Sequence, residues 1–531
     1  MKVTHISYKD TGFFSETMKD YLDSDEKIQP FYNRYPSLQN FGKQLEEKKA
    51  NNISTTQRQQ LVAVLRNQYN NTQTSFETQQ NIKNLLKENT FTITTGHQLN
   101  LFTGPLYFLY KIISTINMCE HLAMQYPNEN FVPIYWMATE DHDFEEINYF
   151  NFKGKKVQWN SNQTGPVGRF STEGLEDVFE VFSEHLGTSR NAIEIKEIFK
   201  KGYLEHETLA NATRYIANEL FGKYGLVILD ADERELKRAL IPYIEYDLLH
   251  ETSYKEVSKT ITALEKNYKI QVNPREINLF YITDSIRERI VFENGIYKVN
   301  DTDISWTKEE ILDHLHSKPE CFSPNVIMRP LYQEVILPNL CYIGGGGELA
   351  YWLELKGYFD KVAVPFPILL LRNSAQILSE KQQKKLEKLN VSKEELFLKQ
   401  DDLLAKKVVE NGETKVDFTQ QKQFLQQQFD DLRALAKKTD VSFVGAVNAQ
   451  ERKQLKGLEN LEKRWLRAEK RRQKDLVERI VALQNELVPN QSLEERQRNF
   501  SEFYLEYGAD FIKVLKENLH PLQLEFALIT L

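Results

Sequence analysis

The sequence is poor in the two residues that break helices. It contains 22 glycines and 16 prolines among 531 residues, about 4% and 3%, against averages of about 7% and 5%. This scarcity, together with 27% charged residues, favours a helix-rich protein. The 41% hydrophobic fraction supplies a core and excludes collagen-like, low-complexity and disordered classes.

Cysteine is scarce and long apolar runs are absent. The three cysteines, Cys119, Cys321 and Cys341, are too few for a disulfide framework, which favours a reducing, cytoplasmic compartment. The longest apolar stretch, 362–371, is too short to span a bilayer, so we expect no membrane association. Residues 1–10 lack the apolar segment of a signal peptide. A net charge of −8 provides no general attraction to nucleic acid.

Four segments predict the strands of a parallel sheet. Residues 91–95 and 131–137 are β-branched or apolar, and apolar residues between them, at 106–116, recur on one helix face. Strand, helix and strand in this order form the unit of a parallel sheet. Residues 224–230 and 362–371 have the composition of further buried strands. The expected fold class is α/β, with a parallel-sheet core.

Changes in composition divide the rest of the chain around this core. Residues 374–490 are rich in Lys, Glu, Gln and Leu, and their apolar residues have near-heptad spacing. This pattern predicts an antiparallel helical arm with a turn near 440–448. The expected segments are an N-terminal helical segment packing on the core (1–90), the core (91–147, 216–239 and 326–373), two inserted connecting subdomains (148–215 and 240–325), a coiled-coil domain (374–490) and a C-terminal core segment (491–531).

The first candidate site follows the strand 91–95. Ligands of parallel sheets bind at the carboxyl ends of the strands, where Gly96 and His97 lie. Thr103 is the expected N-cap of the next helix, and Gly104 would let a phosphate approach its N-terminus. His97 could donate a hydrogen bond to a phosphate oxygen. The alternative is a structural strand-to-helix turn that holds a hydrogen-bonded histidine.

The second candidate site is a crowded acidic segment after the strand 131–137. Neighbouring carboxylates repel one another, and a Mg²⁺ ion or a substrate amine would relieve that repulsion. Asp141, His142 and Asp143 are the candidates. An acidic helix N-terminus is the alternative, and it is the expected role of the neighbouring glutamates.

Later segments add further candidates. Asp230 and Asp232 follow a strand and could hold a hydroxyl or an amine, or cap a helix. Arg329 could pair with a carboxylate or phosphate. The run Gly344–Gly347 could wrap an anion with backbone N–H groups, or be a hinge, but it lacks the Lys-Ser/Thr of a Walker A loop. The basic run 463–474 is more typical of a solvated helix face than of a nucleic-acid site.

Together these motifs resemble the BshC family, to which the cysteine ligase step of bacillithiol biosynthesis is assigned. The resemblance covers nearly the whole chain. The matching segments, in order, are Thr95–Gln98 with Phe102–Tyr107, Trp136–Asn148, Asn325–Pro330, Gly344–Trp352 and Asn499–Tyr504. Two features depart from expectation: glycine stands at 346 where many members have proline, and no counterpart of the synthetase Lys-Met-Ser-Lys-Ser loop is evident.

The resemblance implies both an architecture and a reaction. The architecture is a Rossmann-like core with inserted subdomains, similar to class I aminoacyl-tRNA synthetases and nucleotidyltransferases, and a coiled-coil domain through which subunits form a homodimer. Gly96 and His97 would stand at the place of the synthetase HIGH-type motif. The reaction joins cysteine to the amine of glucosaminyl-malate.

These observations lead to a hypothesis of ATP-dependent amide formation. The expected catalytic residues are His97, Asp141, His142 and Asp143, with Asp141 and Asp143 as candidate ligands of Mg²⁺. The expected substrate-binding residues are Gln98, Asp230, Asp232, Arg329, Gln333, Glu348, Tyr351 and Trp352. The expected nucleotide-binding residues are Gly96, Thr103, Gly104, Gly344, Gly345, Gly346 and Gly347. The alternatives are an adenylating enzyme that joins a different acid and amine, and a nucleotide-binding coiled-coil scaffold without turnover.

Overall fold

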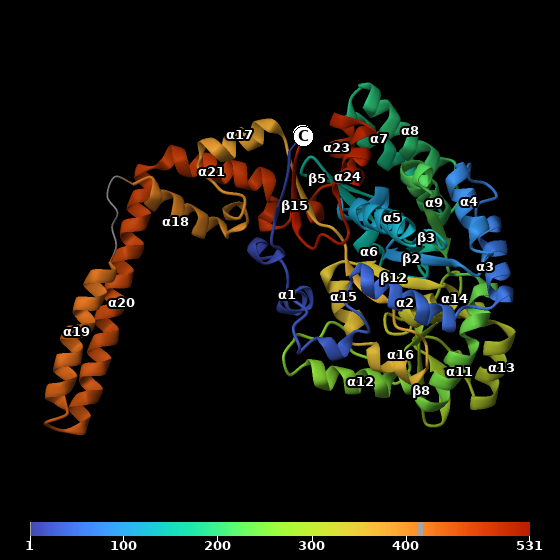
Figure 1. Cartoon of the computed structure of the whole chain (residues 1–531), viewed down its shortest axis with the longest axis horizontal. Helices are drawn as coiled ribbons and strands as arrows, with labels where there is room; N and C mark the ends of the chain where they lie inside the picture. Colours follow the sequence, from blue (N-terminus) through green and yellow to red (C-terminus); the bar gives the residue numbers. More distant parts are fainter. Residues whose placement is uncertain (1, 413–417) are drawn as a thin grey trace.

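A five-stranded parallel sheet forms the centre of the molecule (Figure 1). The structure is a computed structural model that describes residues 2–412 and 418–531. The strand order is β13-β12-β2-β3-β6, and every neighbouring pair is parallel. The strands are β2 (Thr90–His97), β3 (Asn130–Met137), β6 (Val227–Asp230), β12 (Asn339–Gly344) and β13 (Ile368–Leu371). The four predicted strands are confirmed, and β12 is added between two of them.

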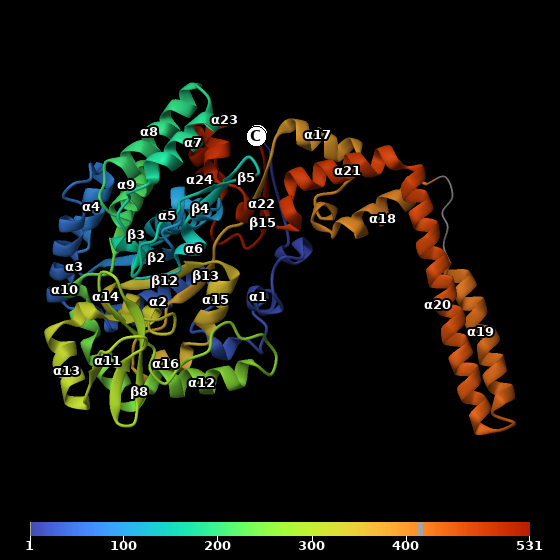
Figure 2. The same cartoon turned by 180° about the vertical axis from the view of Figure 1, so that it is seen from behind.

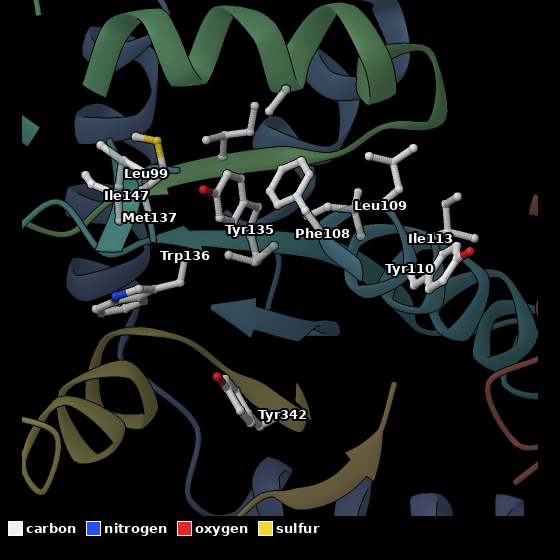
Figure 3. Close-up of a cluster of buried hydrophobic side chains, with 14 of the residues drawn as sticks. Leu99, Phe108, Leu109, Tyr110, Ile113, Tyr135, Trp136, Met137, Ile147 and Tyr342 are labelled. Atoms are coloured by element: carbon white, nitrogen blue, oxygen red, sulfur yellow. The ribbon is translucent and has the colours of Figure 1, made fainter. Parts of the chain in front are cut away.

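The helix α5 (Tyr107–Gln125) connects β2 to β3 and packs against both strands. Figure 3 shows this packing, in which the rings of Phe108 and Tyr135 meet edge to face with centroids 5.3 Å apart. The expectation that Thr103 caps this helix is wrong, since the N-cap residue is Leu106. The reason is that Phe102 and Thr103 adopt left-handed backbone with φ of 46° and 68°, so the chain turns before the helix begins.

Two long insertions follow β3 and β6. The first contains the hairpin β4 (Tyr149–Phe152) and β5 (Lys155–Gln158), then the helices α7 (Leu175–Leu186), α8 (Arg190–Leu204) and α9 (Leu209–Phe221). The second contains α11 (Ile241–His250), α12 (Thr252–Leu264), α13 (Lys308–Ser317) and an antiparallel sheet of order β10-β9-β8-β7-β11. The strands of that sheet are β7 (Leu279–Ile282), β8 (Arg287–Glu293), β9 (Ile296–Val299), β10 (Ser305–Trp306) and β11 (Phe322–Pro324).

A helical arm extends away from the sheet, as Figures 1 and 2 show from opposite sides. It contains α18 (Gln400–Glu410), the paired helices α19 (Thr419–Ala436) and α20 (Val441–Arg472), and α21 (Lys474–Leu487). The turn spans 437–440, because Asp440 caps α20 by accepting from the backbone N–H of Ser442. The predicted turn at 440–448 was therefore placed too late.

The apolar residues with near-heptad spacing between 461 and 487, here called the apolar seam, do not lie on one helix. The chain breaks at Gln473, between α20 and α21. Leu461 at one end is 51% exposed, whereas Ile480, Leu483 and Leu487 are buried. The two halves of the seam therefore face different surroundings.

The C-terminal segment returns to the core. A second sheet has the order β1-β15-β14, with strands β1 (Lys2–Ile6), β14 (Ala375–Leu378) and β15 (Phe526–Thr530). The strand β14 follows β13 after only three residues, 372–374. Residues beyond the arm thereby come to lie beside the end of the central sheet. No helix among the described residues has the length and apolar character needed to cross a membrane.

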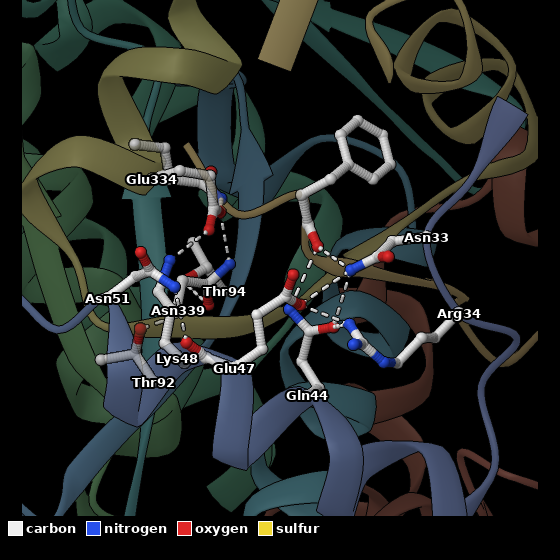
Figure 4. Close-up of polar contacts among 12 residues, drawn as sticks. Asn33, Arg34, Gln44, Glu47, Lys48, Asn51, Thr92, Thr94, Glu334 and Asn339 are labelled. Carbon is white, nitrogen blue, oxygen red and sulfur yellow. Dashed lines mark hydrogen bonds and ion pairs between the residues drawn. The ribbon is translucent and has the colours of Figure 1, made fainter. Parts of the chain in front are cut away.

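A buried ion pair ties the N-terminal helix α2 (Leu38–Ala50) to the sheet (Figure 4). The ammonium of Lys48 lies 3.2 Å from the carboxylate of Glu334, and both side chains are at most 1% exposed. The amide of Asn339 on β12 donates to the same carboxylate at 2.6 Å and accepts from Thr94 of β2 at 2.9 Å. One charge pair thus links α2, β12 and β2.

Replacing Lys48 with methionine should lower the free energy of unfolding by about 3–5 kcal/mol, because it leaves a buried carboxylate without its partner. Denaturant unfolding of the full chain measures this change. Lys49→Met is the control, since Lys49 is 39% exposed and its ion pairs should contribute at most about 1 kcal/mol. Equal losses in both variants would contradict a special role for Lys48. Adding Glu334→Gln to Lys48→Met should recover part of the loss.

Candidate functional site

The carboxyl ends of the parallel strands surround a cavity of about 400 Å³, here called the basic cavity. Gly96 and His97 end β2, Ala138 follows β3, Gly345 follows β12, and Arg372 follows β13, and all five line it. A second cavity of about 490 Å³ adjoins it, because both are lined by Trp136, Ala138, Val326 and Arg329. The second is called the mixed cavity, since it has both carboxylates and arginines in its wall.

Four cationic side chains line the basic cavity, but only one carboxylate does. The cations are Lys111, Arg329, Arg372 and Arg496, and the carboxylate is Glu348. Two cations have carboxylate partners: Lys111 lies 2.7 Å from Glu348, and Arg372 lies 2.6 Å from the buried Glu495. The cavity therefore has an excess of positive charge, which favours an anionic ligand.

Glu348 is held at the start of α15 (Gly346–Leu353). Its carboxylate accepts from the backbone N–H of Gly345 at 2.8 Å and from the hydroxyl of Tyr342 at 2.9 Å. Burial by itself would raise the pKa of Glu348, but the charge and hydrogen bond of Lys111 outweigh it and hold that pKa below its ordinary value. Burial also lowers the pKa of Lys111. Lys111 donates to the carbonyl of Gly96 at 2.7 Å as well, so this pair joins β2 to the glycine run.

Arg329 begins α14 (Arg329–Ile336) and lies among aromatic rings. Its guanidinium carbon is 5.7 Å from the ring centre of Trp136 and 5.6 Å from that of Tyr342. It donates to the side chain of Gln333 at 3.2 Å. No carboxylate forms an ion pair with it in the part of the chain that the structure describes. Arg329 therefore lines both cavities without a direct ion-pair partner in the described chain.

His97 is buried and neutral. Burial, with the charges of Lys111 and Arg372, keeps the pKa of His97 well below its ordinary value. The ring packs against Tyr107 and Phe108 at centroid distances of 5.5 and 5.0 Å. Its Nε2 atom has no hydrogen-bond partner among residues 2–412 and 418–531. The imidazole can therefore offer a donor or an acceptor to a ligand, but not a positive charge.

The acidic segment lines the mixed cavity together with an arginine that sequence analysis missed. One ligand atom from each of Asp141, His142 and Asp143 lies within 4.8 Å of the others. Arg287 of β8 donates to Nδ1 of His142 at 2.7 Å and lies 3.8 Å from Asp141. Its guanidinium stacks on Phe280 at 4.1 Å, so it is fixed there.

These residues fit Mg²⁺ poorly. Mg²⁺ prefers oxygen ligands in octahedral geometry, whereas one of the three candidate donors is the imidazole of His142. Arg287 already supplies a positive charge to the cluster. Gln98 further engages Asp141, donating to its carboxylate at 3.0 Å. An organic amine, which needs only hydrogen-bond acceptors and negative charge, fits the two carboxylates better.

Asp230 and Asp232 lie at the sheet edge but line neither cavity. Asp230 accepts from the hydroxyl of Thr139 and from the backbone N–H of Asp232. Lys237 lies between two carboxylates, 2.8 Å from Asp232 and 2.5 Å from Glu140. Burial by itself would raise the pKa of Asp232. The pKa is nevertheless lowered, and the charge of Lys237 contributes most to the lowering. This network holds the segment after β3 in place.

The other predicted site residues fall into two groups, those that line the basic cavity and those that do not. Gly96, Gln98, Gly345, Gly347, Glu348 and Tyr351 line the basic cavity. The remaining ones line neither the basic nor the mixed cavity: Thr103, Gly104, Gln333, Gly344, Gly346 and Trp352. Trp352 is fully buried, with its ring centre 4.7 Å from that of Tyr342 and the two rings tilted by 31°. The carbonyl of Gly104 accepts from Asn499 at 2.6 Å, so the 103–104 turn is anchored to the C-terminal segment.

Sequence analysis missed Lys111, Arg287, Arg372 and Arg496. The rule that ligands bind at strand ends could have found Arg372, because it directly follows the strand predicted at 362–371. Lys111 lies within an otherwise apolar helix, and Arg287 and Arg496 come from distant segments. No local pattern marks those three.

A parallel Rossmann-like sheet, a cavity with an excess of cationic side chains at the carboxyl ends of its strands, and a coiled-coil arm characterise the chain as a Rossmann-like protein with a coiled-coil domain. The chain belongs to the BshC family. The family model "Bacillithiol biosynthesis BshC, N-terminal Rossmann-like domain" matches residues 1–373. The model "Bacillithiol biosynthesis BshC, C-terminal coiled-coil domain" matches residues 375–531.

Curated relatives agree with this assignment. A protein of Flavobacterium johnsoniae named "Putative cysteine ligase BshC" is 57% identical over 526 residues, covering 99% of each chain. A protein of Christiangramia forsetii with the same name is 56% identical over 535 residues, covering 100% of this chain and 99% of its own. A solved structure titled "putative arginyl t-RNA synthetase", from Campylobacter jejuni, aligns with 88% of this chain and 99% of its own. Its identity is 10% and its TM-score 0.22, too low to define a shared fold.

Replacing Arg287 with glutamine should raise the affinity of the acidic segment for a divalent cation roughly tenfold, because a competing charge about 4 Å away is removed. Titration with Mn²⁺, followed by electron paramagnetic resonance, measures this affinity. Arg238→Gln, which removes an exposed arginine that lines neither cavity, is the control and should leave the affinity unchanged. One result would contradict a poor fit to divalent cations. In it, the unmodified chain binds Mn²⁺ tightly, Asp141→Asn abolishes the binding, and Arg287→Gln leaves it unchanged.

Proposed function

We propose that the chain is a cysteine ligase that joins the carboxyl group of cysteine to the amine of glucosaminyl-malate, the last step of bacillithiol biosynthesis. Membership of the BshC family and the names of its relatives support this assignment. The structural observation that carries it is the basic cavity, where Arg329 and Arg496 lie without carboxylate partners in the described chain. Such a cavity suits a reaction whose substrates bear carboxylates and phosphates.

Amide formation from a free carboxylate requires activation, and we propose ATP as the substrate that supplies it. Activation would give an acyl-adenylate with release of pyrophosphate, or an acyl-phosphate with release of ADP. The amine then attacks the acyl carbon and displaces AMP in the first case or inorganic phosphate in the second. The basic cavity fits a polyphosphate, since Gly345 and Gly347 offer backbone close to its wall and Arg372 lies beside them. Mg²⁺ would accompany the nucleotide phosphates, the manner in which proteins most often bind it.

The residues of this chain have separate proposed roles. Neutral His97 hydrogen-bonds the activated group without adding charge, and Arg329 binds the malate carboxylates. The glycine run with Glu348 closes the cavity.

Asp141 and Asp143 orient the attacking amine and accept its proton. His142 serves as a donor: an arginine cannot accept a hydrogen bond, so Nδ1 of His142 accepts from Arg287 and Nε2 carries the proton. Asp230 and Asp232 act indirectly by holding the segment after β3.

The helical arm is the proposed surface for homodimer formation. Large apolar side chains on it are exposed, among them Phe424 at 67%, Leu435 at 59% and Phe443 at 50%. An exposed apolar surface of this kind is typical of an association site. We also propose a cytoplasmic setting, which the three free cysteines support.

The ligase assignment predicts bacillithiol as the product when purified protein is incubated with cysteine, glucosaminyl-malate, ATP and Mg²⁺. Mass spectrometry measures the product. His97→Ala should reduce the rate at least a hundredfold, because it removes a buried hydrogen-bonding group from the reaction site. His121→Ala, near the end of α5 opposite to the cavity-lining Tyr107 and Lys111, should leave the rate unchanged. Absence of product with every nucleotide tested would refute the ligase assignment.

The same assay separates the alternatives. Product formation with other amines but not with glucosaminyl-malate would support an adenylating enzyme of different specificity. Asp141→Asn should slow the ligation at least tenfold while leaving nucleotide affinity unchanged. A scaffold would instead bind nucleotide without turnover and would be indifferent to this substitution.

A further inference from the structure

Arg372 lines the basic cavity and has one hydrogen-bond donor that is buried without a partner in the described chain. This side chain is 3% exposed. One terminal nitrogen donates to Ser374 at 2.9 Å and the other to Glu495 at 2.6 Å, but Nε has no partner among the described residues. A Cβ atom built on Gly345 would lie 3.7 Å from this Nε, which places the free donor beside the glycine run.

Glu495 fixes Arg372 from the other side. Its side chain is completely buried and accepts from Arg372, from the hydroxyl of Ser374 at 3.1 Å and from the backbone N–H of Ala375 at 3.3 Å. All its contacts thus converge on the short link between β13 and β14. Glu495 belongs to α22 (Glu494–Gln497), which follows the helical arm.

The residue after Glu495 reaches the cavity itself. Arg496 lines the basic cavity and is exposed. Its guanidinium carbon lies 5.9 Å from the ring centre of Tyr107, and that of Arg372 lies 5.0 Å from the same ring. Two guanidiniums thus share one aromatic ring. No carboxylate is paired with Arg496 in the described ranges. Two cationic groups that line the same cavity favour an anion that can contact both of them.

We propose that Arg372 and Arg496 bind one anionic oxygen group of a substrate, and that Glu495 is the positioning residue that aims Arg372 at it. This inference rests on the proposed function and extends it to residues beyond the arm. The family model of the first domain ends at residue 373, and that of the second begins at 375. The second domain thus supplies Glu495 and Arg496 to a site formed by the first. The anionic group is a phosphoryl group or a carboxylate.

Isothermal titration of the full-length chain with ATP and, separately, with malate tests this proposal. Arg496→Gln should weaken binding of one of the two ligands at least tenfold, since a charge-assisted hydrogen bond is lost. Loss confined to ATP assigns the site to a phosphoryl group, and loss confined to malate assigns it to a carboxylate. Arg467→Gln, which removes an exposed arginine from the arm, is the control and should bind both normally.

A matched pair of substitutions tests the positioning role. Glu495→Gln should weaken the same ligand at least tenfold. Glu494→Gln removes an equally buried carboxylate from the same turn, but that carboxylate contacts Ile377 and Arg498 instead of Arg372. Glu494→Gln should lower thermal stability without changing the affinity for the ligand. If the role of Glu495 were merely structural, the two glutamate variants would lose affinity equally.

Three results would overturn the proposal: wild-type affinity in Arg496→Gln, equal loss of affinity in the two glutamate variants, or no binding of either ligand to the unmodified chain at millimolar concentration. Because binding is measured without turnover, these results are distinct from failure of the ligase assay.

Discussion

Positive charge gathered at one edge of a parallel sheet is the constraint on which the rest of the site depends. Lys111 and Arg372 can remain buried there because Glu348 and Glu495 neutralise them. A buried cation without such a partner is strongly destabilising. A backbone N–H group donates to each carboxylate and so helps to hold it in position. Arg329 and Arg496, which have no carboxylate partner in the described chain, are available to a ligand.

This constraint explains why the chain returns to the core after its helical arm. Glu495 and Arg496 lie more than a hundred residues beyond Arg372 in the sequence, yet they share its environment. The sheet β1-β15-β14 fixes that return, since β14 continues directly from β13 and pairs with the last strand. The arm can therefore extend outward while Arg372, before it in the sequence, and Arg496, after it, line the same cavity.

Much of the fold was predictable because it depends on local patterns. The β-branched run at 91–95 and the apolar run at 131–137 form neighbouring central strands, and the arm was evident from its heptad spacing. The N-cap at Thr103 was wrong because Asn499, from the far end of the chain, holds the carbonyls of Phe102 and Gly104. Tertiary contacts of this kind leave no local signal.

The candidate site was predictable where it follows a strand end or belongs to a motif that the sequence singles out, as Arg329 and Glu348 do. His97 and Gly345 line the basic cavity as expected, whereas the decisive basic residues come from a buried helix and from beyond the arm. The most direct measurement is a crystal structure of the chain with ATP and glucosaminyl-malate. The account predicts an anionic oxygen within about 3.2 Å of Arg372 Nε and of the Arg496 guanidinium. Substrate bound with all its anionic groups remote from the basic cavity would contradict it.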